Sequence, residues 1–279
     1  CQHNHAQGWP YFTEHLVLAT PDNGVATAIY AACKATVKVG DGKEITLHEE
    51  TNYPFEEGIA FTVSTDEKVA FPFYLRIPSW TQKVEVRVNG KKVSAAPVAG
   101  KYLCINREWA NGDCVELTLP MSLSMRTWQV NKNSVSVDYG PLTLSLKIAE
   151  KYVEKDSRET AIGDSKWQKG ADSKKWPTTE IYPDSPWNYS LVLDKKEPLK
   201  NFKVIRKSWP ADNYPFTATS VPLEVKAIGR PVPEWKIDET GLCGVLPEED
   251  AGKGDKEEIT LIPMGAARLR ISAFPNTKE

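Results

Sequence analysis

The spacing of apolar residues changes near residue 25, from the period of a helix to the period of a strand. Within QGWPYFTEHLVLAT, residues 7–20, four apolar residues recur at the spacing of one helix face: Trp9, Phe12, Leu16 and Ala19. Pro10 falls where a first helical turn tolerates proline, and the turn sequence PDNG follows at 21–24. We therefore predict one amphipathic helix within residues 1–20.

From residue 25 onward, apolar and polar residues alternate in short runs that are rich in β-branched and aromatic side chains. The run KVEVRVNGKKV, residues 83–93, predicts a hairpin, because its valines alternate and Asn89-Gly90 suits a type I′ turn. The run KYLCINREWANGDCVELTLP, residues 101–120, predicts a second hairpin.

A new series of strands begins after Pro120. The run SVSVDYGPLTLSLKI, residues 134–148, predicts two strands bent at Gly140-Pro141. The segment near 150–175 is too charged for a protein core and predicts a polar surface insertion.

Many closely spaced strands with almost no helix between them indicate antiparallel pairing in a sandwich or jelly roll. The length of 279 residues suggests about two domains. We predict an all-β fold with two antiparallel, jelly-roll-like β-sandwich domains, residues 21–125 and 126–279. The second domain would carry the insertion near 150–175.

Composition and charge exclude some classes of partner. A formal net charge of −2 gives no electrostatic case for nucleic acid or an anionic membrane. No apolar run approaches the roughly 20 residues of a membrane-spanning helix. The nine Trp, ten Tyr and eight Phe suit a strand-rich core, although aromatic side chains also line the sugar-binding sites of all-β modules. The oligomeric state stays open.

Side chains that can bind metal gather in CQHNH, residues 1–5, as Cys1, His3 and His5. No second pair follows at the spacing of a structural zinc motif. A mature lipoprotein also starts at a cysteine, although that cysteine usually leads into a flexible tether. Both interpretations of the N-terminal segment stay open.

The other four cysteines lie in or beside strand-like runs, and each is interpreted as a small buried hydrophobe: Cys33, Cys104, Cys114 and Cys243. Whether Cys104 and Cys114 pair is left open. Five cysteines without a CxxC pair also leave the redox compartment open.

Two carboxylate doublets, Glu49-Glu50 and Glu56-Glu57, lie near aromatic residues, and glycosidases use paired carboxylates. Adjacent residues of a strand point to opposite faces, so neither doublet can act as a facing acid and base. We interpret these four residues as solvated acids. The visible chain gives no nucleophile elbow and no phosphate-binding glycine loop, so no catalytic residue is assigned and the substrate-binding residues are unknown.

A series of short blocks runs in order along nearly the whole chain: GWPYF, TPDNG, EETNYPF, YLRIPSW, INREWANGD, YGPL and ITLIPMGAARLRISAFP. This series resembles the C-terminal part of glycoside hydrolase family 127, formerly a domain of unknown function. The resemblance implies an upstream α/α barrel followed by two β-sandwich domains. It also implies retaining hydrolysis of terminal β-L-arabinofuranosides or related rare pectic sugars, with zinc as cofactor.

In the family, three cysteines and a glutamate hold the zinc, and two of the cysteines are adjacent. The first of that pair is taken as the nucleophile, and a separate glutamate acts as acid and base. Cys1 matches the second cysteine of the pair and would therefore be a zinc ligand. The nucleophile and the other ligands would lie upstream, so we expect the isolated chain to be inactive and to retain no zinc.

The resemblance implies two partners, the upstream barrel of the same protein and a plant-type oligosaccharide substrate. It further implies a bacterial protein of the periplasm or the cytoplasm. A different class of function also fits a strand-rich, aromatic-rich chain, namely a stand-alone carbohydrate-binding β-sandwich module.

Overall fold

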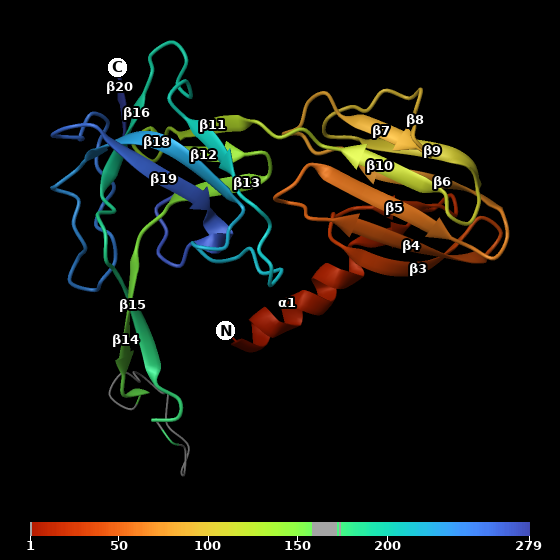
Figure 1. The fold of residues 1–279 in the computed structure, drawn as a ribbon, viewed down its shortest axis with the longest axis horizontal. Helices are drawn as coiled ribbons and strands as arrows, with labels where there is room; N and C mark the ends of the chain where they lie inside the picture. Colours follow the sequence, from red (N-terminus) through yellow and green to blue (C-terminus); the bar gives the residue numbers. More distant parts are fainter. Residues whose placement is uncertain (1, 158–171, 173) are drawn as a thin grey trace. The chain divides into compact units, whose positions relative to one another are not determined.

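The computed structural model describes residues 2–157, 172 and 174–279, and only the backbone of residues 2 and 3. The chain divides into two compact units, Cys1–Ser122 (unit 1) and Leu123–Glu279 (unit 2). The described residues form one α-helix, one short 3-10 helix and many strands in mostly antiparallel sheets (Figure 1). The prediction of an all-β, sandwich-like fold is confirmed.

The helix α1, Gln2–Glu14, begins and ends earlier than its apolar pattern suggested. Leu16 and Ala19, assigned to the helix face, lie beyond it, and Ala19 belongs to strand β1 (Val17–Ala19). Leu16 is buried, and its carbonyl accepts hydrogen bonds from the amides of Ala28 and Ile29, which follow strand β2 (Val25–Thr27). Every residue from 4 to 15 is exposed. In the described part of the chain, no helix is long and apolar enough to cross a membrane.

Unit 1 contains two sheets with a hydrophobic core between them. The first sheet, which we call sheet A, has the order β1 (Val17–Ala19), β2 (Val25–Thr27), β6 (Val69–Arg76) and β9 (Tyr102–Trp109). Sheet B has the order β3 (Cys33–Val39), β4 (Lys43–Thr51), β5 (Gly58–Ser64), β10 (Cys114–Thr118), β7 (Glu85–Val88) and β8 (Lys91–Lys92). Alternation along each strand turns one set of side chains inward.

Aromatic rings join the two sheets of unit 1. Phe61 of sheet B meets Phe73 of sheet A edge to face, with ring centroids 5.4 Å apart. Phe73 in turn contacts Trp109 at 5.9 Å. Trp109 is fully buried, and its indole N–H donates to the carbonyl of Phe71 at 3.0 Å. The large buried aromatics thus form the core, and their polar atoms are satisfied.

Of the two predicted hairpins, one is confirmed and one is wrong. β7 and β8 pair around Asn89-Gly90, whose φ angles of 51° and 75° are both positive, as a type I′ turn requires. β9 and β10 do not pair with each other. β9 pairs with β6 in sheet A, whereas β10 pairs with β5 and β7 in sheet B.

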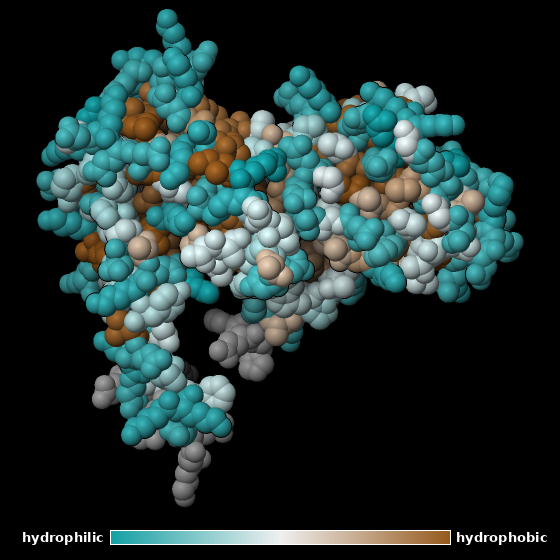
Figure 2. Space-filling view, in the orientation of Figure 1, coloured by the Kyte–Doolittle hydropathy of each residue, from teal (hydrophilic) through white to brown (hydrophobic). Residues whose placement is uncertain are grey.

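Unit 2 is built on one large sheet. Its order is β11 (Leu123–Trp128), β12 (Ser134–Tyr139), β13 (Leu142–Leu146), β19 (Glu257–Pro263), β18 (Leu223–Pro231), β16 (Tyr189–Leu193) and β20 (Asn276–Lys278), with β17 (Lys203–Arg206) beside β18. The 3-10 helix Met264–Ala266 follows β19. β12 and β13 join at Gly140, with φ 56°. On the face of each unit that Figure 2 shows, hydrophilic residues surround scattered apolar patches.

The polar stretch near 150–175 starts as a strand. β14 (Glu150–Lys155) and β15 (Thr178–Pro183) pair along six residues each as a separate two-stranded ribbon. Residues 158–171 of the predicted insertion lie outside the described residues.

Candidate functional site

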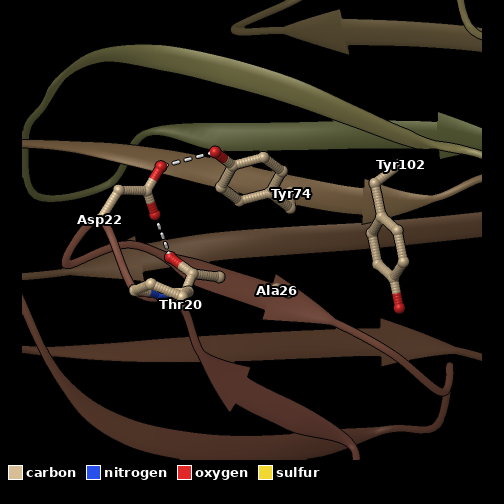
Figure 3. A pocket seen from close by; sticks show the side chains of 6 residues that line it. Thr20, Asp22, Ala26, Tyr74 and Tyr102 are labelled. Atoms are coloured by element: carbon tan, nitrogen blue, oxygen red, sulfur yellow. Dashed lines mark hydrogen bonds between the residues drawn. The ribbon is translucent and has the colours of Figure 1, made fainter.

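The outer face of sheet A carries an open cavity of about 520 Å³. We call it the tyrosine groove and define it by its lining residues: Thr20, Pro21, Asp22, Ala26, Tyr74 and Tyr102. It lies entirely within unit 1. Figure 3 shows Asp22 and Tyr74 joined at one end and Tyr102 standing apart from them.

Strand alternation explains why these side chains share one face. On β6, Phe73 and Leu75 are fully buried, and Tyr74 between them points outward. Parallel pairing sets Ala26 of β2 beside Tyr74. Antiparallel pairing with β9 sets Tyr102 diagonally across from it, within reach of a long aromatic side chain. The small side chain of Ala26 leaves the space open.

A hydrogen-bonded cluster closes one end of the tyrosine groove. The Tyr74 hydroxyl donates to Asp22 Oδ2 at 2.6 Å, and the Thr20 hydroxyl donates to Asp22 Oδ1. The bonds from Thr20 and then Tyr74 lower the pKa of Asp22, and the bond to Asp22 raises the pKa of Tyr74. At neutral pH the groove therefore holds a carboxylate and a neutral phenol.

The turn that carries Asp22 is held tightly against β6. A Cβ atom on Gly24 would lie 2.2 Å from the carbonyl oxygen of Pro72, so only glycine fits there. The Gly24 amide also donates to the Thr20 hydroxyl at 3.0 Å. The carboxylate is thus positioned by the backbone as well as by its side-chain partners.

The structure does not place the one residue that the resemblance assigned to zinc. Cys1 lies outside the described residues, as does the side chain of His3. His5 is exposed on α1. Among the described residues, no group of three or more His, Cys, Asp or Glu could hold a metal ion.

The interpretation of the later cysteines as buried is wrong for Cys104 and Cys243, which are exposed, while Cys33 and Cys114 are half-buried. All four are free thiols. Cys104 lies on the outer face of sheet A beside Tyr74, whereas Cys114 lies in sheet B. Their strands are not neighbours, which explains why they do not pair.

Glu49 and Glu50 point to opposite faces of β4, as predicted, but Glu49 is not solvated. Its side chain is 1% exposed, accepts the Ala31 amide at 3.0 Å and lies 3.9 Å from Cys33 Sγ. Burial raises the pKa of Glu49 to about 8. Glu49 is the buried acid that sequence reasoning missed, although it follows Ile45 and Leu47 in the inward phase of the strand.

Unit 2 offers two further cavities. One, of about 630 Å³, lies beside Lys147, Glu150 and Arg268, where Arg268 donates its amide to Glu150 at 3.2 Å. The other, of about 320 Å³, is mostly apolar and includes Trp187 and Leu242. The first also places a tyrosine beside an anchored carboxylate, because the Tyr152 hydroxyl donates to Glu150, but its lining includes two cations, whereas the lining of the tyrosine groove includes none. The second has no Asp or Glu in its lining.

Most of unit 1 is similar to a domain of a known protein family. Residues 24–121 match the family model described as the middle domain of GH127 β-L-arabinofuranosidases. The resemblance to glycoside hydrolase family 127 is confirmed. The GH127 match falls within unit 1 and includes three of the six residues that line the tyrosine groove, Ala26, Tyr74 and Tyr102. No curated protein matches the chain.

Solved GH127 structures extend the similarity to both units. One is Ara127N-Se, a GH127 β-L-arabinofuranosidase from Geobacillus stearothermophilus T6, with 20% identity and a TM-score of 0.60 over 96% of this chain and 35% of that chain. Another is the GH127 β-arabinofuranosidase BT3674, with 20% identity and a TM-score of 0.57 over 93% and 37%. At this identity the likeness shows the fold. The chain spans about a third of the length of these structures.

Proposed function

We propose that this chain is the C-terminal portion of a retaining glycoside hydrolase of the GH127 type, acting on terminal β-L-arabinofuranosyl or related rare pectic sugars. The match of residues 24–121 to the GH127 middle domain carries this proposal. Because the chain spans about a third of the similar structures, the proposal includes a helical catalytic barrel elsewhere in the same protein. The two units would support that barrel.

The helix α1 supports this role. Trp9, Tyr11 and Phe12 have exposed fractions of 59%, 65% and 39%. Covering such apolar surface stabilises an assembly by about 25 cal/mol for each Å² removed from water. The barrel would supply the cover, so α1 would be its last helical segment and not part of a sandwich.

Zinc enters the proposal only through Cys1. A bound zinc ion would keep a cysteine as thiolate and fix its direction. The described residues form no metal site of their own, so no reaction step is assigned to them. The nucleophile, the acid/base glutamate and the remaining ligands would all come from the barrel.

The test uses the protein encoded by the complete gene. We expect about one zinc per chain and hydrolysis of p-nitrophenyl β-L-arabinofuranoside. Cys1→Ser should lower both zinc content and activity by at least tenfold. Cys104→Ser, which changes an exposed thiol of sheet A, is the matched control and should leave both unchanged. Unchanged zinc in Cys1→Ser would contradict the ligand assignment, and absence of hydrolysis by the wild type would contradict the activity.

The second candidate function is a stand-alone carbohydrate-binding module, which the tyrosine groove favours. It predicts no hydrolysis by the complete protein. The same assay therefore separates the two functions.

A further inference from the structure

We propose that the tyrosine groove is a binding site for neutral oligosaccharides. One sugar ring would lie against Tyr102 while its hydroxyls bond to Asp22. All of its lining residues belong to unit 1, and a sugar needs neither zinc nor hydrolysis to bind there. The inference therefore stands or falls independently of zinc and of hydrolysis.

The wall of the groove suits the apolar face of a sugar ring. Tyr102 is 49% exposed, on a strand whose inward residues Leu103 and Trp109 are buried. Covering the exposed aromatic ring with the C–H groups of a sugar is favourable, because it removes apolar surface from water. The tyrosine hydroxyl can stay hydrated. Ala26, which lies beside Tyr74, has a small side chain that leaves room for a sugar ring.

The polar end of the groove requires a ligand that donates hydrogen bonds. Each oxygen of Asp22 accepts one hydroxyl, from Thr20 and from Tyr74, and keeps further lone-pair capacity. The Tyr74 hydroxyl already donates its proton to Asp22, so its oxygen can only accept a hydrogen bond from a ligand. Sugar hydroxyls supply such donors, and hydrogen bonds to a carboxylate are stronger than those between neutral groups.

The site is built before the ligand arrives. Gly24 packs against Pro72 and fixes the turn, and Tyr74 is anchored on a central strand of sheet A. A ligand would therefore not have to order the carboxylate on binding, which reduces the entropic cost.

Charge decides which sugars fit. The six lining residues include the Asp22 carboxylate and no Lys or Arg. Because the pKa of Asp22 is lowered, the groove is anionic at neutral pH. A uronate would bring a second negative charge next to the first, which disfavours binding. Neutral pentose or hexose units are thus favoured over the acidic units of a pectin backbone.

The test titrates residues 1–279 with arabinotetraose, xylotetraose and tetragalacturonate, followed by NMR chemical shifts of the labelled protein. We expect at least one neutral tetrasaccharide to bind saturably with a millimolar or lower dissociation constant. Tetragalacturonate should bind at least tenfold more weakly. No saturable binding of either neutral sugar, or equal binding of the acidic one, would overturn the proposal.

Variants locate the site. Tyr102→Ala and Asp22→Ala should each weaken neutral-sugar binding at least fivefold, whereas Tyr102→Phe keeps the ring and should stay within twofold. Tyr214→Ala removes a tyrosine of similar exposure, 51%, from unit 2 and should have no effect. Binding that survives both Tyr102→Ala and Asp22→Ala would place the sugar elsewhere and refute the assignment. Thermal unfolding of each variant shows that it is folded.

Discussion

Glu49 makes the stability of unit 1 depend on pH. Its pKa in the folded chain is about 8, against an ordinary value of 4.5, so the folded state holds a proton that the unfolded state releases. The free energy of unfolding should therefore fall as pH rises from about 4.5 to 8, by up to roughly 5 kcal/mol. Glu49→Gln stays neutral and should remove this fall. Urea unfolding at pH 5, 7 and 9 measures it.

Glu50→Gln is the control, because Glu50 lies next to Glu49 on the same strand but is exposed. We expect it to keep the pH dependence of the wild type. A Glu49→Gln variant with the wild-type loss of stability between pH 5 and 9 would show that another group is responsible.

The burial of Glu49 could have been predicted from the sequence. Ile45, Leu47 and Glu49 occupy one phase of the alternation in KEITLHEE, so the glutamate falls on the inward face. What the pattern could not reveal is its environment, because Ala31 comes from the loop before β3 and reaches Glu49 only in the folded unit. Likewise, Asp22 and Tyr74 are 52 residues apart and meet only through the pairing of β2 with β6.

The turn between β1 and β2 is the element that positions the tyrosine groove, and it depends on Gly24. In Gly24→Ala the added methyl group would collide with Pro72, so the turn must move away from β6. We expect a loss of about 2 kcal/mol in the free energy of unfolding, as for other overpacked sites. Guanidinium unfolding measures it.

Gly58→Ala serves as the matched control, because a Cβ at that position in unit 1 meets nothing within 4 Å. It should change the free energy of unfolding by less than about 0.5 kcal/mol. Equal effects of the two substitutions would mean that the close approach of the turn to β6 does not constrain the fold.

Sequence patterns predicted where the strands lie, but they did not predict reliably which strands pair with each other. The Asn89-Gly90 turn lies entirely within its hairpin, so the sequence sufficed. The runs that became β9 and β10 carry an equally clear alternation, yet they diverge into different sheets. Adjacent strands in a sandwich often cross from one sheet to the other, and the alternation of side chains is the same in either case. The early end of α1 also reflects pairing with a strand that follows later in the chain. Val17, which lies within the range of the predicted helix, pairs instead with Thr27 of β2.

At the scale of the whole molecule, each unit has a hydrophobic core of its own. Phe61 belongs to the core of unit 1 and Phe274 to that of unit 2, and both are fully buried. Because cooperative unfolding follows the core, we expect calorimetry to resolve two transitions. Phe61→Ala should lower the transition temperature of unit 1 alone, and Phe274→Ala that of unit 2 alone. In each case the unit should lose the roughly 3–5 kcal/mol of unfolding free energy that is typical of a buried Phe→Ala change. Each variant is the control for its counterpart. If both substitutions shifted a single shared transition, the two units would be one cooperative body, and the strand series on either side of Ser122 would not mark a boundary in stability.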